Sequence, residues 1–362
     1  MSLVLEAVGK VVGAQAHISE VSLTLARGTL NVLLGPTLSG KTSLMRLMAG
    51  LDRPSNGRVV MDGQDVTGVR VQKRNVAMVY QQFVNYPSLS VYENIASPLR
   101  VARIGAAEID KRVREAARLL RIDDLLDSMP LELSGGQQQR TAIARALVKR
   151  AELVLLDEPL ANLDYKLREE LREELPKIFR DSGAIMVYAT TEPTEALLLG
   201  GNTAVLHEGR VTQFGPTIEV YRQPRDLVTA RNFSDPPLNT MTIEKQGGSV
   251  RLATGTEISA AGALAGLPTG RYVVGFRAHH LLLSRPSHDA VALAGTVAVS
   301  EITGSESFVH VDVAGERWVS LVSGVHAIEP GATIELYLDP ERFFVFDAEG
   351  QLAAAPDRAA AA

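Results

Sequence analysis

The sequence predicts an α/β domain followed by a small all-β domain. From residue 1 to about 234, short apolar runs bounded by breakers alternate with stretches of helical periodicity, a pattern typical of layered α/β domains. Near Asp235-Pro236-Pro237 the pattern changes. Beyond it come only short alternating runs separated by Gly, Asp or Pro, which favours a small β-barrel or sandwich.

The apolar and periodic runs place the individual elements. Buried strands are predicted at Leu30–Leu34, Val76–Tyr80, Leu153–Asp157 and Ile185–Ala189. Helices are predicted at Lys41–Ala49, Ala107–Leu120, Gln137–Lys149 and Tyr165–Phe179. In the second part, strands are predicted at Arg271–Phe276, Gly295–Glu301, Ser307–Val313, Arg317–Leu321, Thr333–Leu338 and Arg342–Phe346. The Ala-rich end, 353–362, has no periodic pattern, and we expect it to be disordered.

Composition excludes several classes of protein. The chain has 362 residues, of which 46% are hydrophobic and 22% are charged, as in ordinary globular proteins. A net charge of −5 argues against a nucleic-acid binder. The absence of cysteine excludes disulfides and thiolate metal sites. Because Met1–Lys10 does not resemble a signal peptide and no apolar run approaches roughly 20 residues, we expect a soluble chain or one that is peripheral on a membrane.

A phosphate-binding loop follows the first predicted strand. Residues 35–42 fit G-x-x-x-x-G-K-[ST] at every fixed position, between a strand and a helix as the motif requires. Lys41 would reach the β- and γ-phosphates, and the Thr42 hydroxyl would bind Mg²⁺. The alternative is a chance Gly-rich turn with a solvated lysine. The residues expected to bind ATP are Gly35, Pro36, Thr37, Leu38, Ser39, Gly40, Lys41, Thr42 and Ser43.

Two carboxylates follow the strand Leu153–Asp157. The strand would deliver Asp157 to Mg²⁺, and Glu158, one residue past its end, would polarise the attacking water as general base. The alternative is a pair of surface acids in a turn before Pro159. The phosphate loop in the same chain favours the catalytic interpretation.

A second anion-binding segment precedes the helix predicted at Gln137–Lys149. Ser134, Gly135 and Gly136 form a short loop before it. One chain cannot readily wrap both helix termini around one γ-phosphate, whereas two chains packed head to tail can. The alternative is an ordinary Gly-containing helix start.

These segments together resemble the ATPases of ABC transporters. Leu133–Gln137 looks like their signature sequence, in which Ser134, Gly135, Gly136 and Gln137 would act on the partner's nucleotide. Gln81 matches the Q-loop glutamine that senses Mg²⁺ and the γ-phosphate. Ala161–Asp164 resembles the D-loop, in which Asp164 links the two sites of a dimer. The resemblance implies ATP and Mg²⁺ as cofactors, with Thr42, Gln81 and Asp157 at the metal.

The segments 80–87 and 91–95 are similar to the maltose-type sugar and glycerol-phosphate importer branch. In that branch Phe83, Val84 and Tyr86 lie on a surface that receives the membrane subunits; plain core packing is the alternative. The branch also has a C-terminal regulatory domain. Residues 304–306 and 339–342 of this chain resemble motifs of that domain. We therefore expect a P-loop ABC cassette over 1–234, with a RecA-like core and a helical subdomain at about 88–150, then an OB-like β-domain over 235–352.

The same resemblance implies partners and a location. They are transmembrane permease subunits, a second ATPase subunit and, indirectly, a solute-binding protein. The chain would lie peripherally on the cytoplasmic face of the plasma (inner) membrane. The segment 188–199 resembles one subunit of the two-ATPase glycerol importers, so a glycerol-type solute is a hypothesis.

Two positions depart from the family pattern. Thr191 occupies the place of the switch histidine, and no histidine occurs between His17 and His207. A short, neutral hydroxyl cannot act as an imidazole does. No aromatic residue occurs before Tyr80, so the adenine ring would meet Val12 or, less readily, His17.

Both departures weaken the site built on this chain's own phosphate loop, while Ser134–Gln137 and Asp164 serve the partner's site. We therefore favour a heterodimer with a complete ATPase subunit over a homodimer. Two other functions compete. A soluble ABC ATPase for DNA repair or ribosome work would need a coiled-coil insertion or two cassettes. A non-catalytic regulatory cassette is favoured by Thr191 and opposed by Glu158.

Overall fold

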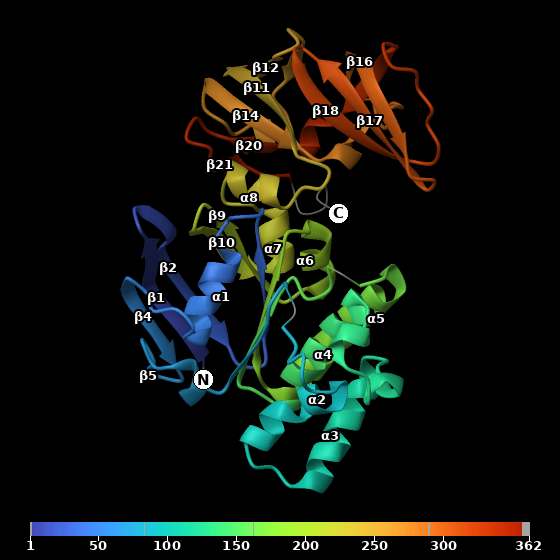
Figure 1. The fold of residues 1–362 in the computed structure, drawn as a ribbon. Helices are drawn as coiled ribbons and strands as arrows, with labels where there is room; N and C mark the ends of the chain where they lie inside the picture. Colours follow the sequence, from blue (N-terminus) through green and yellow to red (C-terminus); the bar gives the residue numbers. More distant parts are fainter. Residues whose placement is uncertain (1, 83, 162, 289, 357–362) are drawn as a thin grey trace. The chain divides into compact units, whose positions relative to one another are not determined.

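The structure is a computed structural model that describes residues 2–82, 84–161, 163–288 and 290–356. The chain divides into two compact units, Met1–Thr217 and Ile218–Ala362, and each is described by itself (Figure 1). Within the described ranges, no helix is long and apolar enough to span a bilayer.

The first unit is built on a six-stranded central sheet with the order β10-β9-β3-β8-β7-β6. The strands are β3 (Leu30–Leu34), β6 (Val76–Val79), β7 (Leu153–Asp157), β8 (Ile185–Thr190), β9 (Asn202–His207) and β10 (Arg210–Pro216). All are parallel to their neighbours except β10, which pairs with β9 antiparallel. The four strands predicted in this region are confirmed, β6 ending one residue earlier and β8 one residue later than expected.

A second, four-stranded sheet of the first unit has the order β2-β1-β4-β5. Its strands are β1 (Ser2–Val12), β2 (Gln15–Ala26), β4 (Asn56–Met61) and β5 (Gln64–Asp65). No strand was predicted here. Register shifts between Leu5 and Val11 interrupt the alternation along β1, so its sequence lacks the strict period of two that marks a strand. The two sheets enclose one apolar cluster that includes Leu5, Leu33 and Met45.

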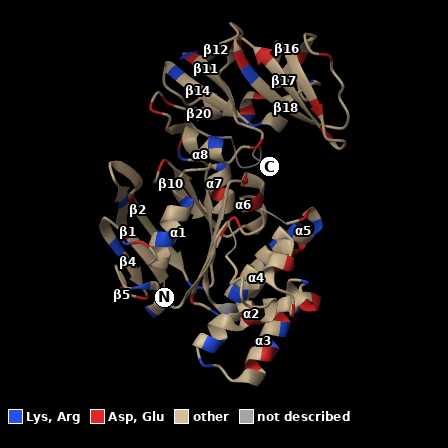
Figure 2. Ribbon diagram, in the orientation of Figure 1, with Lys and Arg blue, Asp and Glu red and all other residues tan. Residues whose placement is uncertain are grey.

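Helices complete the first unit. They are α1 (Lys41–Ala49), α2 (Val91–Val101), α3 (Ala106–Leu119), α4 (Gly135–Val148), α5 (Tyr165–Ser182) and α6 (Pro193–Leu199). Helices α2, α3 and α4 form a lobe to one side of the sheets (Figure 1). Acidic and basic residues are interspersed along α3 and α5 (Figure 2), as solvated helix faces require. Helix α2 was not predicted, because Pro98 interrupts its pattern.

The second unit begins with two short helices, α7 (Thr217–Arg222, whose first residue belongs to the first unit) and α8 (Leu227–Asn232). Two sheets follow, with the orders β13-β12-β11-β14-β20-β21 and β15-β19-β16-β17-β18. Their strands are β11 (Asn239–Gln246), β12 (Ser249–Leu252), β13 (Glu257–Ser259), β14 (Gly270–Phe276), β15 (Leu281–Leu282), β16 (Val291–Ile302), β17 (Glu306–Val313), β18 (Glu316–Ser323), β19 (Thr333–Leu338), β20 (Phe344–Phe346) and β21 (Leu352–Ala354). The predicted all-β domain is confirmed.

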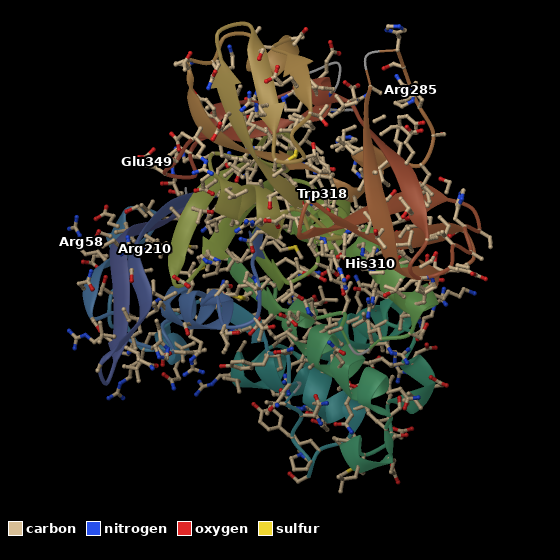
Figure 3. All side chains as sticks on the ribbon, turned by 90° about the horizontal axis from the view of Figure 1, so that it is seen from above. Arg58, Arg210, Arg285, His310, Trp318 and Glu349 are labelled. Carbon is tan, nitrogen blue, oxygen red and sulfur yellow. The ribbon has the colours of Figure 1, made fainter. Side chains whose placement is uncertain are left out.

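The two sheets of the second unit share one core. Trp318 is 1% exposed, its ring lies edge-on to Phe276 at 5.1 Å, and its Nε1–H donates to the Thr240 carbonyl at 3.1 Å. Figure 3 shows Trp318 within this unit and Arg285 at its rim. Trp318 thus joins the two sheets through a buried ring contact and a hydrogen bond from its N–H.

Three predicted limits differ from the structure. The units divide at 217/218 rather than near 235, because α8 packs through Ala230 against Phe344 and Phe346 of β20. The expected disorder of 353–362 is wrong for Ala353 and Ala354, which lie in β21. Residues 357–362 lie outside the described ranges. Arg342, predicted in a strand, belongs instead to a short 3₁₀ helix before β20.

His280 makes the second unit sensitive to acid. Burial and the neighbouring charges of His279, Arg277 and Arg342 lower the pKa of His280 from 6.5 to about 3. The unfolded chain therefore binds a proton between these values that the folded unit excludes. The free energy of unfolding therefore decreases as pH falls below 6.5, by up to about 1.4 kcal/mol per pH unit.

Thermal unfolding followed by Trp318 fluorescence should show this dependence on pH, and His280→Gln should show a weaker dependence. His326→Gln, at a ring that bonds the Ser323 carbonyl, is the control; equal slopes in both variants would contradict the assignment.

Candidate nucleotide site

The predicted site residues meet at one edge of the central sheet. In the parallel register Leu34 pairs with Thr190 and Asp157 pairs with Ala189, so β3, β7 and β8 end side by side. The backbone N–H of Glu158 donates to the Ala189 carbonyl at 3.1 Å. The phosphate loop, the two carboxylates and the segment at Thr191 therefore follow three adjacent strand ends, where α/β sheets bind ligands.

The phosphate loop adopts a conformation that its glycines permit. Gly40 has φ 104° and immediately precedes α1, and a Cβ on Gly35 would lie 2.3 Å from the Leu206 carbonyl oxygen. Lys41 is 6% exposed, and its Nζ donates to the carbonyls of Gly35 and Pro36 at 2.8 and 3.1 Å. Burial lowers the pKa of Lys41, while the charges of Glu158 and Asp157 raise it. The ammonium is held over a loop shaped to receive an anion.

Thr42 and Asp157 are in direct contact. The Thr42 hydroxyl donates to Asp157 Oδ2 at 2.6 Å. Burial raises the pKa of Asp157, while this hydrogen bond and the positive charge of Lys41 lower it. These oxygens suit Mg²⁺, and a divalent cation would favour the ionised carboxylate. In the part of the chain that the structure describes, no cluster of three or more His, Cys, Asp or Glu could hold a metal. Nucleotide phosphates and water would therefore have to supply the remaining ligands.

Glu158 lies between the phosphate loop and Gln81. Its Oε1 is 3.7 Å from Lys41 Nζ, and its Oε2 accepts a hydrogen bond from Gln81 Nε2 at 3.0 Å. Burial raises the pKa of Glu158, and the charge of Lys41 opposes that shift. The arrangement orients one carboxylate beside the lysine that would hold the γ-phosphate, as a general base for water requires.

A hollow of about 710 Å³ opens above these groups. It is lined by Gln15, Ala16, His17, Thr37, Leu38, Gly40, Lys41, Thr42, Ser43, Gln81, Glu158, Glu208 and Gly209. Gln15, Ala16, Glu208 and Gly209 were not predicted, because only tertiary structure brings the start of β2 and the β9–β10 turn here. The lining includes His17 and not Val12, so His17 is the better placed of the two to meet an adenine ring.

Thr191 and Asp164 do not line the hollow in the described structure. Thr191 is exposed in the turn between β8 and α6. Asp164 is exposed just before α5, where its Oδ1 accepts a hydrogen bond from the Leu167 N–H at 3.0 Å.

The signature residues form the start of α4. Ser134 is the N-cap, its Oγ accepting from the Gln137 N–H at 3.4 Å and its N–H donating to Gln137 Oε1 at 2.8 Å. The two glycines belong to the first helical turn rather than to a loop before it, which corrects the predicted start at Gln137. Ser134–Gln137 are absent from the described lining of the hollow. Their helix terminus thus remains available to an anion held elsewhere.

Val84 and Tyr86 are not core residues. They are 59% and 50% exposed, so core packing is wrong for them. Arg145 of α4 lies over the Tyr86 ring at 5.1 Å and bonds the Val84 carbonyl, which fixes the loop to the helical lobe. Phe83 lies outside the described residues.

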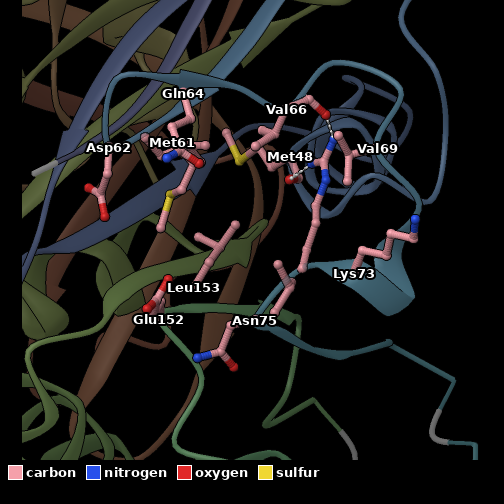
Figure 4. Close-up of a pocket in the computed structure, with 13 residues that line it drawn as sticks. Met48, Met61, Asp62, Gln64, Val66, Val69, Lys73, Asn75, Glu152 and Leu153 are labelled. Atoms are coloured by element: carbon pink, nitrogen blue, oxygen red, sulfur yellow. Dashed lines mark hydrogen bonds between the residues drawn. The ribbon is translucent and has the colours of Figure 1, made fainter.

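A second hollow of about 290 Å³ lies in the first unit, at the amino ends of β6 and β7 (Figure 4). Met48, Met61 and Leu153 contribute to its apolar wall. Asp62 and Glu152 at its rim are paired with Arg27 at 2.5 and 3.4 Å. None of the predicted site residues lines it, whereas Lys41, Gln81 and Glu158 line the hollow at the opposite ends of the strands.

Comparison with known proteins identifies the family. The ABC transporter family model matches residues 18–161, and the TOBE domain model matches 274–346. The trehalose/maltose import ATP-binding protein MalK of Thermococcus litoralis is 35% identical over 94% of this chain and 96% of its own length. The chain belongs to the ATP-binding subunits of ABC transporters. It is an ATPase of that family.

Other relatives and solved structures support this membership. The sn-glycerol-3-phosphate import ATP-binding protein UgpC of Escherichia coli is 34% identical over 93% of this chain and 95% of its own. A dimeric bacterial ABC transporter cassette has a TM-score of 0.56 at 28% identity, covering 59% of this chain and 98% of that one. A dimeric cassette in a post-hydrolysis state, bound to ADP and Pi, has a TM-score of 0.55 at 28% identity. The ABC transporter subunit therefore has the expected cassette and C-terminal β-domain.

Proposed function

We propose that this ABC subunit hydrolyses ATP to drive import of a sugar, polyol or glycerol-type solute through membrane permease subunits. One observation carries the proposal: Lys41, Gln81 and Glu158 line one hollow in a chain that is similar, over nearly its whole length, to import ATP-binding proteins. Those relatives are named for trehalose/maltose and sn-glycerol-3-phosphate. The subunit would act at the cytoplasmic face of the membrane, bound to its permeases.

The residues have separate tasks in this proposal. Backbone N–H groups of 35–43 and the Lys41 ammonium bind and orient the phosphates. Thr42 and Asp157, with Gln81, would hold Mg²⁺, which would neutralise phosphate charge when bound. Glu158 accepts the proton of the attacking water. Gln81 holds the Glu158 carboxylate in place through its 3.0 Å hydrogen bond.

The proposal includes a heterodimer. Thr191 cannot supply an imidazole, and Val12 is 51% exposed and does not line the hollow. Ser134 is exposed at the start of α4, where it and Gln137 form a capping box. This chain would therefore lend a complete signature to a second ATPase subunit whose own site turns over faster.

Replacing Thr191 by His tests that asymmetry. Restoring the imidazole should raise ATP turnover of the assembled transporter by up to about twofold, because the slower of its two sites gains a hydrogen-bonding group at the γ-phosphate. Thr194→His, three residues along at an exposed position of α6, is the control and should change nothing. A large gain in a purified homodimer would instead show that the chain needs no second ATPase.

Affinity purification of the tagged chain from detergent-solubilised membranes tests the transport function. We expect permease subunits and a second ATPase to co-purify, and a sugar, polyol or glycerol-type solute with its binding protein to stimulate ATP hydrolysis. Purification with no membrane protein would contradict an importer. The competing non-catalytic cassette predicts that solute-stimulated hydrolysis is unchanged when Glu158 is replaced.

A further inference from the structure

Glu158 has a backbone conformation that needs external support. Its φ is 46°, in the left-handed region that non-glycine residues rarely adopt. Such a conformation persists only where surrounding contacts hold it. Among the described residues of the loop that leads from Glu158 to α5, the Ala161 N–H donates to the Glu158 carbonyl at 3.4 Å and the Leu163 N–H donates to the Leu160 carbonyl at 3.2 Å. Other parts of the chain must therefore fix this loop.

Gln139 of α4 supplies one such contact. It is 0% exposed, and its Nε2 donates a hydrogen bond to the carbonyl of Pro159, the residue next to Glu158. Within the described residues its Oε1 is buried without a hydrogen-bond partner. A buried amide with an unsatisfied acceptor lowers the free energy of unfolding. The burial of Gln139 therefore indicates that its hydrogen bond to Pro159 has a role that offsets this cost.

Arg168 of α5 holds the same loop from the other side. Its Nη2 donates to the Ala161 carbonyl at 3.1 Å, and its Nη1 lies 3.6 Å from Glu192 Oε1 in the turn that follows Thr191. The loop is thus fixed by a partly exposed arginine and by one fully buried glutamine. Because the buried contact cannot exchange with water, Gln139 is the stronger constraint.

The position of Gln139 gives this contact a further consequence. It lies one turn after Ser134, the N-cap whose helix terminus is available to an anion. A shift of the start of α4 would be transmitted to Pro159 and hence to Glu158. We propose that Gln139 is a positioning residue that couples the Ser134–Gln137 segment to the Glu158 carboxylate. This inference rests on the proposed function of Glu158 as general base.

The test uses Gln139→Met, which keeps side-chain length and removes the donor, in the transporter assembled with its permeases and with a second ATPase disabled at its own base, so that only this chain's site turns over. We expect kcat for ATP hydrolysis to fall on the order of 10- to 100-fold, with KM and equilibrium ATP affinity changing by less than about twofold. Arg168→Met should lower kcat less, and Arg168→Lys should partly restore it. Lys166→Met, exposed on the same helix, should leave kcat unchanged.

A double-mutant cycle separates positioning from general damage. If Gln139 acts through Glu158, Gln139→Met should cause no further loss of kcat in a Glu158→Gln background. An unchanged kcat in the single variant, an additive loss in the cycle, or an equal fall in ATP affinity and melting temperature would each overturn the inference. If Glu158→Gln alone leaves hydrolysis intact, the proposed function fails instead.

Discussion

Replacing Glu158 by Gln should reduce ATP hydrolysis at this chain's site by about 10²- to 10⁴-fold, the usual contribution of a general base. The isosteric amide can still accept the hydrogen bond from Gln81 Nε2, so local structure should persist. ATP affinity should hold or increase, because a negative charge 3.7 Å from Lys41 is removed from the phosphate side.

Phosphate release and ATP binding should be measured on the assembled transporter, since the second ATPase contributes its own turnover. A partner subunit disabled at its own base isolates this chain's site. Glu173→Gln makes the same charge change at an exposed position of α5 and should have no effect. Absence of hydrolysis in that background before Glu158 is replaced would favour the non-catalytic regulatory cassette, whereas hydrolysis that survives Glu158→Gln there would show that Glu158 is not the general base.

Replacing Lys41 by Met should weaken ATP binding on the order of 10- to 100-fold, the range for losing a hydrogen bond to a charged group. The ammonium is 6% exposed and bonds only loop carbonyls and Glu158 among the described residues. A bound phosphate would replace these partners. The variant also removes the positive charge next to Glu158. Because burial raises the pKa of Glu158 and that charge lowers it, the pKa of Glu158 should rise in Lys41→Met.

Isothermal titration of the full-length chain with ATP measures the Lys41 effect directly, without the permeases. Lys166→Met, an equivalent change at an exposed site, is the matched control. Unchanged affinity in Lys41→Met would show that the nucleotide does not bind over this loop. Affinity lost equally in both variants would indicate damage to the fold rather than loss of a phosphate contact.

Local sequence was sufficient to predict the elements that are marked by a continuous apolar run or by a motif of fixed spacing. Strands β3 and β7 and helix α1 begin and end where the apolar runs predict, because a buried parallel strand is a continuous apolar run and the phosphate loop marks the junction. The same short-range signals identified Lys41, Asp157, Glu158 and Ser134. The resemblance to ABC ATPases rests on these motifs and was confirmed by the comparisons.

Only tertiary structure decided what surrounds those residues. Strand β1 was not predicted because bulges break its alternation. Strand β2 was not predicted either, although Val21, Leu23 and Leu25 alternate with exposed residues, and the position of His17 in the hollow depends on β2. The contact of Gln139 with Pro159 joins residues 20 apart in sequence. The division at 217/218 depends on α8 packing on β20. Local patterns encode the phosphate loop and the Glu158 carboxylate that we propose as general base, whereas the contacts that hold this carboxylate in place are long-range and arise only when the chain has folded.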